Sequence, residues 1–315
     1  MKNFIHYLKS FLKEHFNWLS YLATLFFCAL LLYANYGLGL ETELRSELKN
    51  WNRTYGDFLY FLIAQGGAYL ISLVLVLGLG RKLKMLKSVQ FFMLFLFGFL
   101  ILAMDRSYHG YSAFRSHFSR EAYLYFIYMV LELKSWVFLF IPLLILHLAY
   151  FKKYNFGLFG IRFQEVNFKP YFTLLLIMLP FVLVAAFTEG FQASYPIYPE
   201  RIVNQLATSQ NYPKTILVIG YELAYLLDFF TVELFFRGFL ILGFIKVLGK
   251  EAVLPMAVTY CVLHFGKPMG EAISSIFGGY ILGVFAYYSK NIWGGVFIHA
   301  GIAGLMELCA FLIKA

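Results

Sequence analysis

Three short segments near the carboxyl end of the chain contain ionisable residues of types that can move protons. They are Glu233 in Glu-Leu-Phe-Phe-Arg, His264 in Tyr-Cys-Val-Leu-His, and His299 in Ile-His-Ala-Gly. A carboxylate and an imidazole can together act as acid and base on a bound water. The same nitrogen and oxygen donors could instead hold Zn²⁺ with one coordination position open. We therefore expect a polar site of Glu233, His264 and His299, and both the metal-free and the zinc forms remain open.

These residues lie in strongly apolar sequence. The chain is 61% hydrophobic and only 14% charged, with a mean hydropathy of +0.71. An ionisable side chain inside a bilayer costs at least about 2.5–3.5 kcal/mol unless it is paired or faces water. A shared pocket, in which the three groups neutralise or hydrate one another, is the arrangement that lowers this cost.

The pattern of apolar segments predicts an all-α, polytopic bundle of about eight to nine transmembrane helices, on a criterion of about 20 apolar residues each. The segments are roughly 18–38, 57–79, 89–104, 124–151, 170–188, 214–245, 252–266, 272–288 and 292–312. The stretch 189–214 contains Pro196, Pro199 and Pro213, so we expect a loop there, and a candidate lid over the later helices. It separates N-terminal scaffold spans, 1–190, from a core that carries the polar site, 214–312.

Charge and cysteine content restrict the partners. The net charge of +9 is explained by basic loops on the cytoplasmic side of a membrane, so we expect membrane lipid and no nucleic acid as partners. The Arg81–Lys87 loop and the Lys152–Lys153 pair place the N-terminus in the cytoplasm. This predicts an integral protein of a bacterial inner membrane. The three cysteines fall at unrelated positions inside apolar segments and indicate neither disulfides nor a thiolate metal site.

Four charged residues, Glu222, Asp228, Glu233 and Arg237, share the apolar segment from Thr215 to Ile245. Glu233 and Arg237 are four residues apart with the acid first, the favourable order for an ion pair on a helix. Glu222 falls within about 60° of this pair at 100° per residue. Asp228 falls near Val232 instead, so it needs a partner from another helix or is protonated.

The order Glu-x3-Arg, aromatic-x3-His and a final helix with His resembles the CAAX-protease and bacteriocin-processing (CPBP) family, which includes the type II CAAX prenyl endopeptidases. The resemblance covers roughly residues 214–310. It implies a membrane helical bundle that hydrolyses peptide bonds near or within the bilayer, with peptide or protein substrates. It also implies that a glutamate and the first histidine activate water, while the last histidine and a following amide or acid stabilise the oxyanion.

The chain departs from the family pattern at two positions. Val232 stands where the family has the first of two glutamates, and Ala303 stands where it has the amide or acid. Asp228, one turn before Val232, is the candidate replacement acid. Three functions remain open: an endopeptidase with a divergent site, a non-catalytic relative that binds peptides or proteins, and a proton-coupled transporter with Glu222 and Asp228 in a relay.

Different arrangements would distinguish these functions. An enzyme requires His264 and His299 to converge with a carboxylate. A binding relative would have Val232 and Ala303 filling the pocket, and the carboxylate of Glu233 would be fully engaged in an ion pair with Arg237. A transporter is expected to contain repeated segments, and the apolar Glu-Leu-Phe-Phe-Arg segment has no second copy in the sequence.

Overall fold

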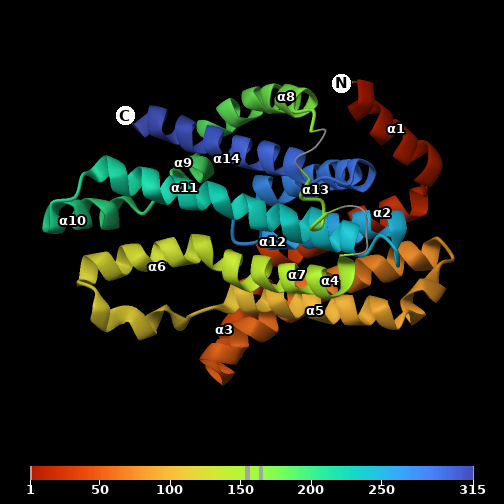
Figure 1. The fold of residues 1–315 in the computed structure, drawn as a ribbon, viewed down its shortest axis with the longest axis horizontal. Helices are drawn as coiled ribbons and strands as arrows, with labels where there is room; N and C mark the ends of the chain where they lie inside the picture. Colours follow the sequence, from red (N-terminus) through yellow and green to blue (C-terminus); the bar gives the residue numbers. More distant parts are fainter. Residues whose placement is uncertain (1, 153–156, 163–165, 315) are drawn as a thin grey trace.

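The computed structural model describes residues 2–152, 157–162 and 166–314, and the regular elements of this part are helices (Figure 1). Lys153, half of the basic pair used above for orientation, lies outside the described residues. The helices of the first half are α1 (Lys2–His15), α2 (Trp18–Leu32), α3 (Leu40–Trp51), α4 (Arg53–Leu79), α5 (Val89–Ser107), α6 (Arg120–Ser135) and α7 (Ile141–Leu146). Those of the second half are α8 (Lys169–Ala186), α9 (Glu189–Ser194), α10 (Glu200–Gln210), α11 (Lys214–Glu233), α12 (Val253–Leu263), α13 (Met269–Ser289) and α14 (Trp293–Lys314).

The length and hydropathy of the helices make the chain an integral membrane protein. Within the described residues, seven helical segments are long and apolar enough to cross a bilayer. They are Trp18–Gly37, Tyr55–Leu79, Val89–His117, Arg120–Phe151, Lys169–Ala186, Met269–Ser289 and Trp293–Lys314. This is fewer than the eight to nine expected. The segments 214–245 and 252–266 fall outside the set, and α12, which forms most of the second, has only 11 residues.

The later part of the first segment and most of the second are buried inside the bundle. Helix α11 continues without a break into a π-helical segment, η6 (Leu234–Gly243), and all ten residues of η6 are buried. In Figure 1, α11 runs between α14 and α8 on one side and α4 to α7 on the other. The largest apolar cluster joins η6 to α4, α5 and α12. Glu233 and Arg237 are therefore enclosed by protein rather than presented to lipid.

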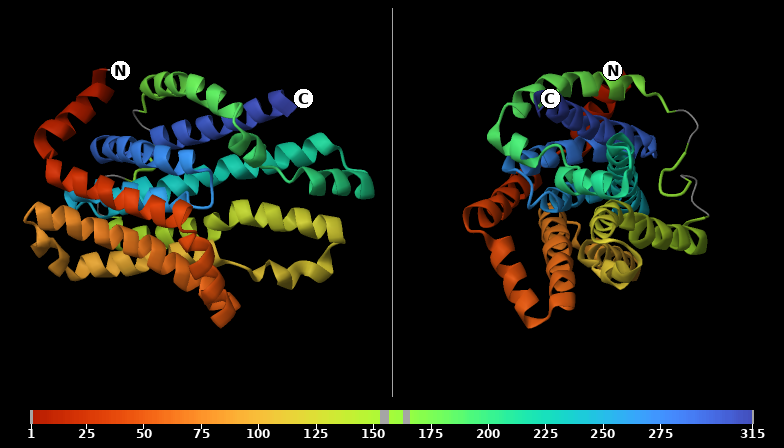
Figure 2. Two further views of the ribbon diagram at one scale, coloured as in Figure 1. Left: turned by 180° about the vertical axis from the view of Figure 1, so that it is seen from behind. Right: turned by 90° about the vertical axis from the view of Figure 1, so that its left-hand side faces the viewer.

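Close packing against η6 depends on a glycine of α5. A Cβ built on Gly98 would lie 2.3 Å from Cε1 of Phe239, so a larger residue would push the two helices apart. Figure 2 shows that the two chain ends lie on the α8 side of the bundle and are separated along its long axis.

The proline-containing stretch before α11 is more regular than expected. It holds two short helices, α9 and α10, joined by a segment that includes Tyr195 and Ile197. Pro199 precedes α10 directly and Pro213 precedes α11 directly. A proline at a helix start costs little, because the first N–H groups of a helix have no partner within it. The prolines thus mark where these helices begin.

Candidate functional site

The two histidines singled out in the sequence line the same cavity. It has a volume of about 350 Å³ and lies between α8, α11, α12, α13 and α14. Most of its wall is apolar, with Phe229, Ile298 and Ile302 among the contributors. A few polar side chains converge on this apolar wall, an arrangement typical of binding and active sites.

His264 follows the last residue of α12 and is held by the backbone of the same helix. Its Nδ1 lies 2.8 Å from the carbonyl oxygen of Tyr260. Because a carbonyl can only accept, this nitrogen carries the proton, and Nε2 is left with a lone pair. Since His264 lines the cavity, this ring is set up to accept a proton from a bound molecule.

His299 lies between a carboxylate and a hydroxyl. Its Nδ1 is 3.3 Å from Oε1 of Glu233, and the hydroxyl of Tyr260 is 3.0 Å from its Nε2. The ring of Phe229 packs against the imidazole, with centroids 4.2 Å apart. A carboxylate beside one ring nitrogen fixes the orientation of an imidazole and its preferred proton position. Glu233 therefore orients His299.

Glu233 is itself paired with Arg237. Nη1 of Arg237 donates to Oε1 of Glu233 at 2.7 Å, and both side chains are almost fully buried. The guanidinium carbon of Arg237 also lies 4.2 Å from the ring centre of Tyr260. Arg237 lines the cavity, whereas Glu233 is not one of the lining residues. The carboxylate thus acts from behind His299 and does not face a bound substrate directly.

The local helix geometry is unusual at this position. Glu233 ends α11, and Arg237 lies within the π-helical segment η6. Such segments often mark functional sites, because the wider turn displaces side chains from ordinary helical positions. At about four residues per turn, Glu233 and Arg237 stay on one face of the helix.

Tyr260 joins these groups together. Its ring contacts Arg237, its hydroxyl contacts His299, and its carbonyl holds His264. Ala303, where the family has a polar residue, lines the same cavity one turn after His299 on α14. Tyr260 lines the same cavity and carries a hydroxyl group, which the alanine lacks.

Asp228 is not brought to this site. Its Oδ1 accepts from Oγ1 of Thr231 at 2.9 Å, and Ser135 of α6 also donates to its carboxyl group. Val232 packs against the main apolar core. Neither residue lines the cavity of the two histidines, so the geometry gives no support to Asp228 as a replacement acid there.

Glu222 also lies apart from Glu233. Its carboxyl group interacts with Glu307 of α14, whose oxygens accept from the backbone N–H of Ile197. Glu222 is absent from the cavity lining. A relay through Glu222, Asp228 and the histidines, as a proton-coupled transporter would need, therefore gains no support.

The residues present do not fit a zinc ion. In the described ranges, no group of three or more His, Cys, Asp or Glu side chains is arranged to hold a metal. Oε1 of Glu233 is engaged by Arg237, and Nδ1 of His264 is engaged by a carbonyl.

Further polar residues that sequence reasoning did not single out also line the cavity, among them Tyr195, Lys267 and Glu271. The hydroxyl of Tyr195 donates to Oε1 of Glu271 at 3.0 Å, and Nζ of Lys267 is 3.7 Å from Oε2 of Glu271. Burial raises the pKa of Tyr195, and the Glu271 charge raises it further, so the hydroxyl keeps its proton. The sequence signal for the contact between Lys267 and Glu271 was their spacing of four residues at the start of α13.

Comparison with known families supports the resemblance read from the motifs. Residues 214–305 match the family described as Type II CAAX prenyl endopeptidase Rce1-like. The matched range covers α11, η6, α12, α13 and most of α14, and so includes Glu233, Arg237, His264 and His299. No curated protein and no solved structure matches the chain. Residues 214–305 therefore form an Rce1-like type II CAAX prenyl endopeptidase domain of the CPBP family.

Proposed function

We propose that the chain is an intramembrane endopeptidase of the type II CAAX protease type, which hydrolyses a peptide bond in the cavity of His264 and His299. The observation that carries the proposal is that both imidazoles line one cavity, with the carboxylate of Glu233 3.3 Å behind one of them. Membership of the domain in a protease family implies peptide substrates. The apolar wall suits a substrate segment that enters from the membrane.

In this proposal His264 is the general base. Its Nε2 takes a proton from water, and the resulting hydroxide attacks the carbonyl carbon of the scissile bond. As the C–N bond breaks, the same nitrogen returns the proton to the leaving amine. A positioned base of this kind contributes about 10²–10⁴ in rate.

The negative charge that develops on the carbonyl oxygen needs a donor. We assign this role to the hydroxyl of Tyr260, which lies 3.0 Å from Nε2 of His299, the ring that Glu233 orients. In the free protein the hydroxyl donates its one proton to this nitrogen. When a substrate is bound, the O–H turns and donates the proton to the carbonyl oxygen instead. This hydroxyl substitutes for the amide or acid that Ala303 replaces. The loss of one such donor lowers the rate by about 10²–10³ in other enzymes.

The test is proteolysis by the purified protein in nanodiscs, with a peptide library as substrate. His264→Ala and His299→Ala are expected to abolish cleavage, whereas His6→Ala, an exposed histidine of α1, is expected to retain it. Equal cleavage by all of these proteins would identify a contaminating protease and reject the proposal.

A second candidate, peptide binding without hydrolysis, is favoured by a different observation. The Glu233 carboxylate is engaged by Arg237 and does not line the cavity, while Val232 lies in the core. If library peptides bind the wild-type protein uncut, and Ala303→Phe blocks the binding by filling the cavity, this candidate replaces the first.

A further inference from the structure

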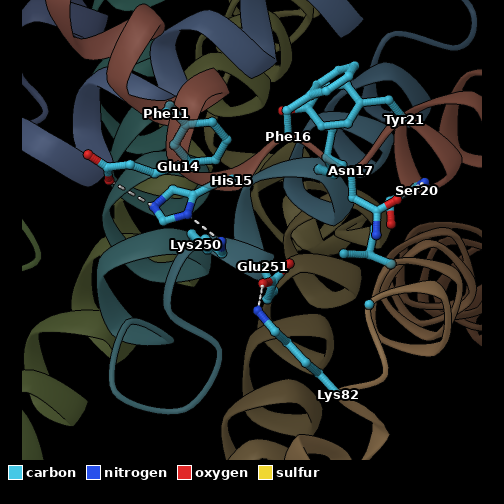
Figure 3. Close-up of a pocket in the computed structure, with 13 residues that line it drawn as sticks. Phe11, Glu14, His15, Phe16, Asn17, Ser20, Tyr21, Lys82, Lys250 and Glu251 are labelled. Atoms are coloured by element: carbon cyan, nitrogen blue, oxygen red, sulfur yellow. Dashed lines mark hydrogen bonds and ion pairs between the residues drawn. The ribbon is translucent and has the colours of Figure 1, made fainter.

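A second cavity lies at another part of the bundle and shares no lining residue with the first. It has a volume of about 220 Å³ and is bounded by α1, the start of α2, the end of α4 and residues 250–254 (Figure 3). The aromatic rings of Phe11, Phe16 and Tyr21 stand beside its polar groups. Nothing in the proposed peptidase mechanism uses it.

The cavity is lined by charges of both signs. Nζ of Lys82 is 2.6 Å from Oε1 of Glu251, as the dashed line in Figure 3 shows. Two lysines and two glutamates, Lys82, Lys250, Glu14 and Glu251, therefore border a space large enough for a small polar group. A ligand with only one sign of charge would meet like charges on part of the wall.

Of the two lysines that line this cavity, Lys82 forms an ion pair with a carboxylate and Lys250 does not. Its ammonium contacts Nδ1 of His15, and Nε2 of His15 lies 3.4 Å from Oε2 of Glu14. Nδ1 must accept from an ammonium, so the imidazole is neutral and offers Lys250 no opposite charge. Throughout the described part of the chain, no carboxylate oxygen lies within 4.0 Å of the Lys250 nitrogen.

The electrostatic surroundings of Lys250 also favour an anionic ligand beside it. Burial lowers the pKa of Lys250, nearby Glu251 opposes this effect, and the charge of Lys82 adds to the lowering. Burial and the charge of Lys250 also lower the pKa of His15. An anionic oxygen placed beside Lys250 would favour its charged form.

The surface next to the cavity is suited to lipid chains. Phe16, at its edge, is 57% exposed, and Trp18, Leu22 and Phe26 of α2 are 59%, 55% and 66% exposed. These residues belong to the first candidate membrane span and its approach. A molecule with its polar end in the cavity could lay apolar chains along the exposed face of α2.

We propose that this cavity binds the headgroup of a zwitterionic phospholipid of the phosphoethanolamine type. The phosphate lies against the ammonium groups of Lys250 and Lys82, and the primary ammonium of the headgroup donates to the carboxylates of Glu14 and Glu251. A free phosphate shares the first contact but leaves the carboxylates unmatched. A quaternary choline group has no N–H to donate to them.

The experiment measures lipid binding to the purified full-length protein by native mass spectrometry, with phosphatidylethanolamine, phosphatidylcholine, phosphatidylglycerol and inorganic phosphate as separate probes. Phosphatidylethanolamine is expected to bind best. Lys250→Met is expected to weaken its binding about tenfold or more, the effect of losing one charge-assisted hydrogen bond. Lys84→Met, an exposed lysine outside the cavity, is the matched control and is expected to change nothing.

Glu14→Gln provides a second variant at a more exposed position, where the side chain is 56% accessible and folding is little affected. It is expected to reduce the preference for phosphatidylethanolamine over phosphatidylglycerol. Unchanged binding in both Lys250→Met and Glu14→Gln overturns the proposal. Equal binding of phosphatidylglycerol or inorganic phosphate by the wild type also overturns it, because that result defines a simple anion site.

Discussion

The carboxylate of Glu233 fits against the bare backbone of Gly295. A Cβ built at residue 295 would lie 2.1 Å from Oε2 of Glu233, closer than any side chain could remain. Among the described residues this oxygen has no hydrogen-bond partner, while Oε1 contacts both Arg237 and His299. The glycine therefore lets α14 approach the end of α11 closely enough for His299 to reach the carboxylate.

Gly295→Ala is expected to destabilise the protein and to displace Glu233 from His299. Overpacking of a tight interior costs about 1–3 kcal/mol, which outweighs the gain of up to about 1 kcal/mol from alanine in a helix. Thermal unfolding in detergent checks this. Gly67→Ala in α4 is the control, because a Cβ there meets nothing within 4 Å. Equal stability of the two variants would contradict the packing argument.

Arg237→Met should be one of the most damaging single changes. It leaves the Glu233 carboxylate buried without its charge partner, an effect of about 3–5 kcal/mol for buried ion pairs. The double variant Glu233→Gln, Arg237→Met removes both charges and should recover part of the loss. Chemical unfolding of the two single variants and the double variant measures the coupling. Strictly additive losses would show that the two side chains act independently.

Tyr260→Phe tests the role of the hydroxyl separately from that of the ring, because it removes only the hydroxyl. The ring contact with Arg237 remains, so stability should fall only by about 0.5–1.5 kcal/mol, the net value of one hydrogen bond. Peptide cleavage should fall by about 10²–10³ if the hydroxyl is the oxyanion donor. Steady-state kinetics provide the measurement, with Tyr280→Phe, which lies outside the cavity lining, as a control. An unchanged kcat would remove Tyr260 from the mechanism.

The segment between α9 and α10 is held over the cavity by side chains of the last helix. Glu307 accepts from the backbone N–H of Ile197 at 3.1 Å, and Nζ of Lys314 donates to the carbonyl of Tyr195 at 2.7 Å. Glu307→Ala should therefore speed hydrogen exchange in the 195–198 segment, because the Ile197 amide loses its acceptor. Mass spectrometry after deuterium labelling measures this. Glu307→Gln retains an acceptor and should exchange more slowly than the alanine variant; identical rates would rule out the contact.

Lys290 should make stability rise with pH. It lies between the last two candidate spans, and burial lowers its pKa to about 8 from the ordinary 10.5. The folded protein then binds fewer protons than the unfolded chain between about pH 8 and 10.5, so unfolding becomes less favourable as the pH increases through this window. The difference in Tm between wild type and Lys290→Met should shift in favour of the wild type from pH 7 to pH 10. A constant difference would mean that Lys290 titrates normally.

Several features could be predicted because they depend on residues close in sequence. Glu233 and Arg237 are one turn apart, so their proximity follows from helix geometry alone. The apolar composition likewise predicts a polytopic helical membrane protein. Fewer candidate spans are found than expected, and the segments left out include η6, which is wholly buried, and α12, which has only 11 residues.

Other features depend on contacts between distant segments. Glu222 and Glu233 share a helical face in projection, yet Glu222 meets Glu307, 85 positions further along the chain. The partners of Asp228 include Ser135 of α6, which no local pattern could identify. The π-helical geometry of η6 also has no simple sequence signature. All of its residues, 234–243, are buried.

The threefold attachment of Tyr260 has a mechanical consequence. One residue supports a guanidinium through its ring, one imidazole through its hydroxyl and another through its carbonyl. A displacement of α12 along its axis would move all three supports by the same amount and in the same direction. The polar centre should consequently assemble or come apart as a single rigid unit, and partly assembled intermediates should be scarce.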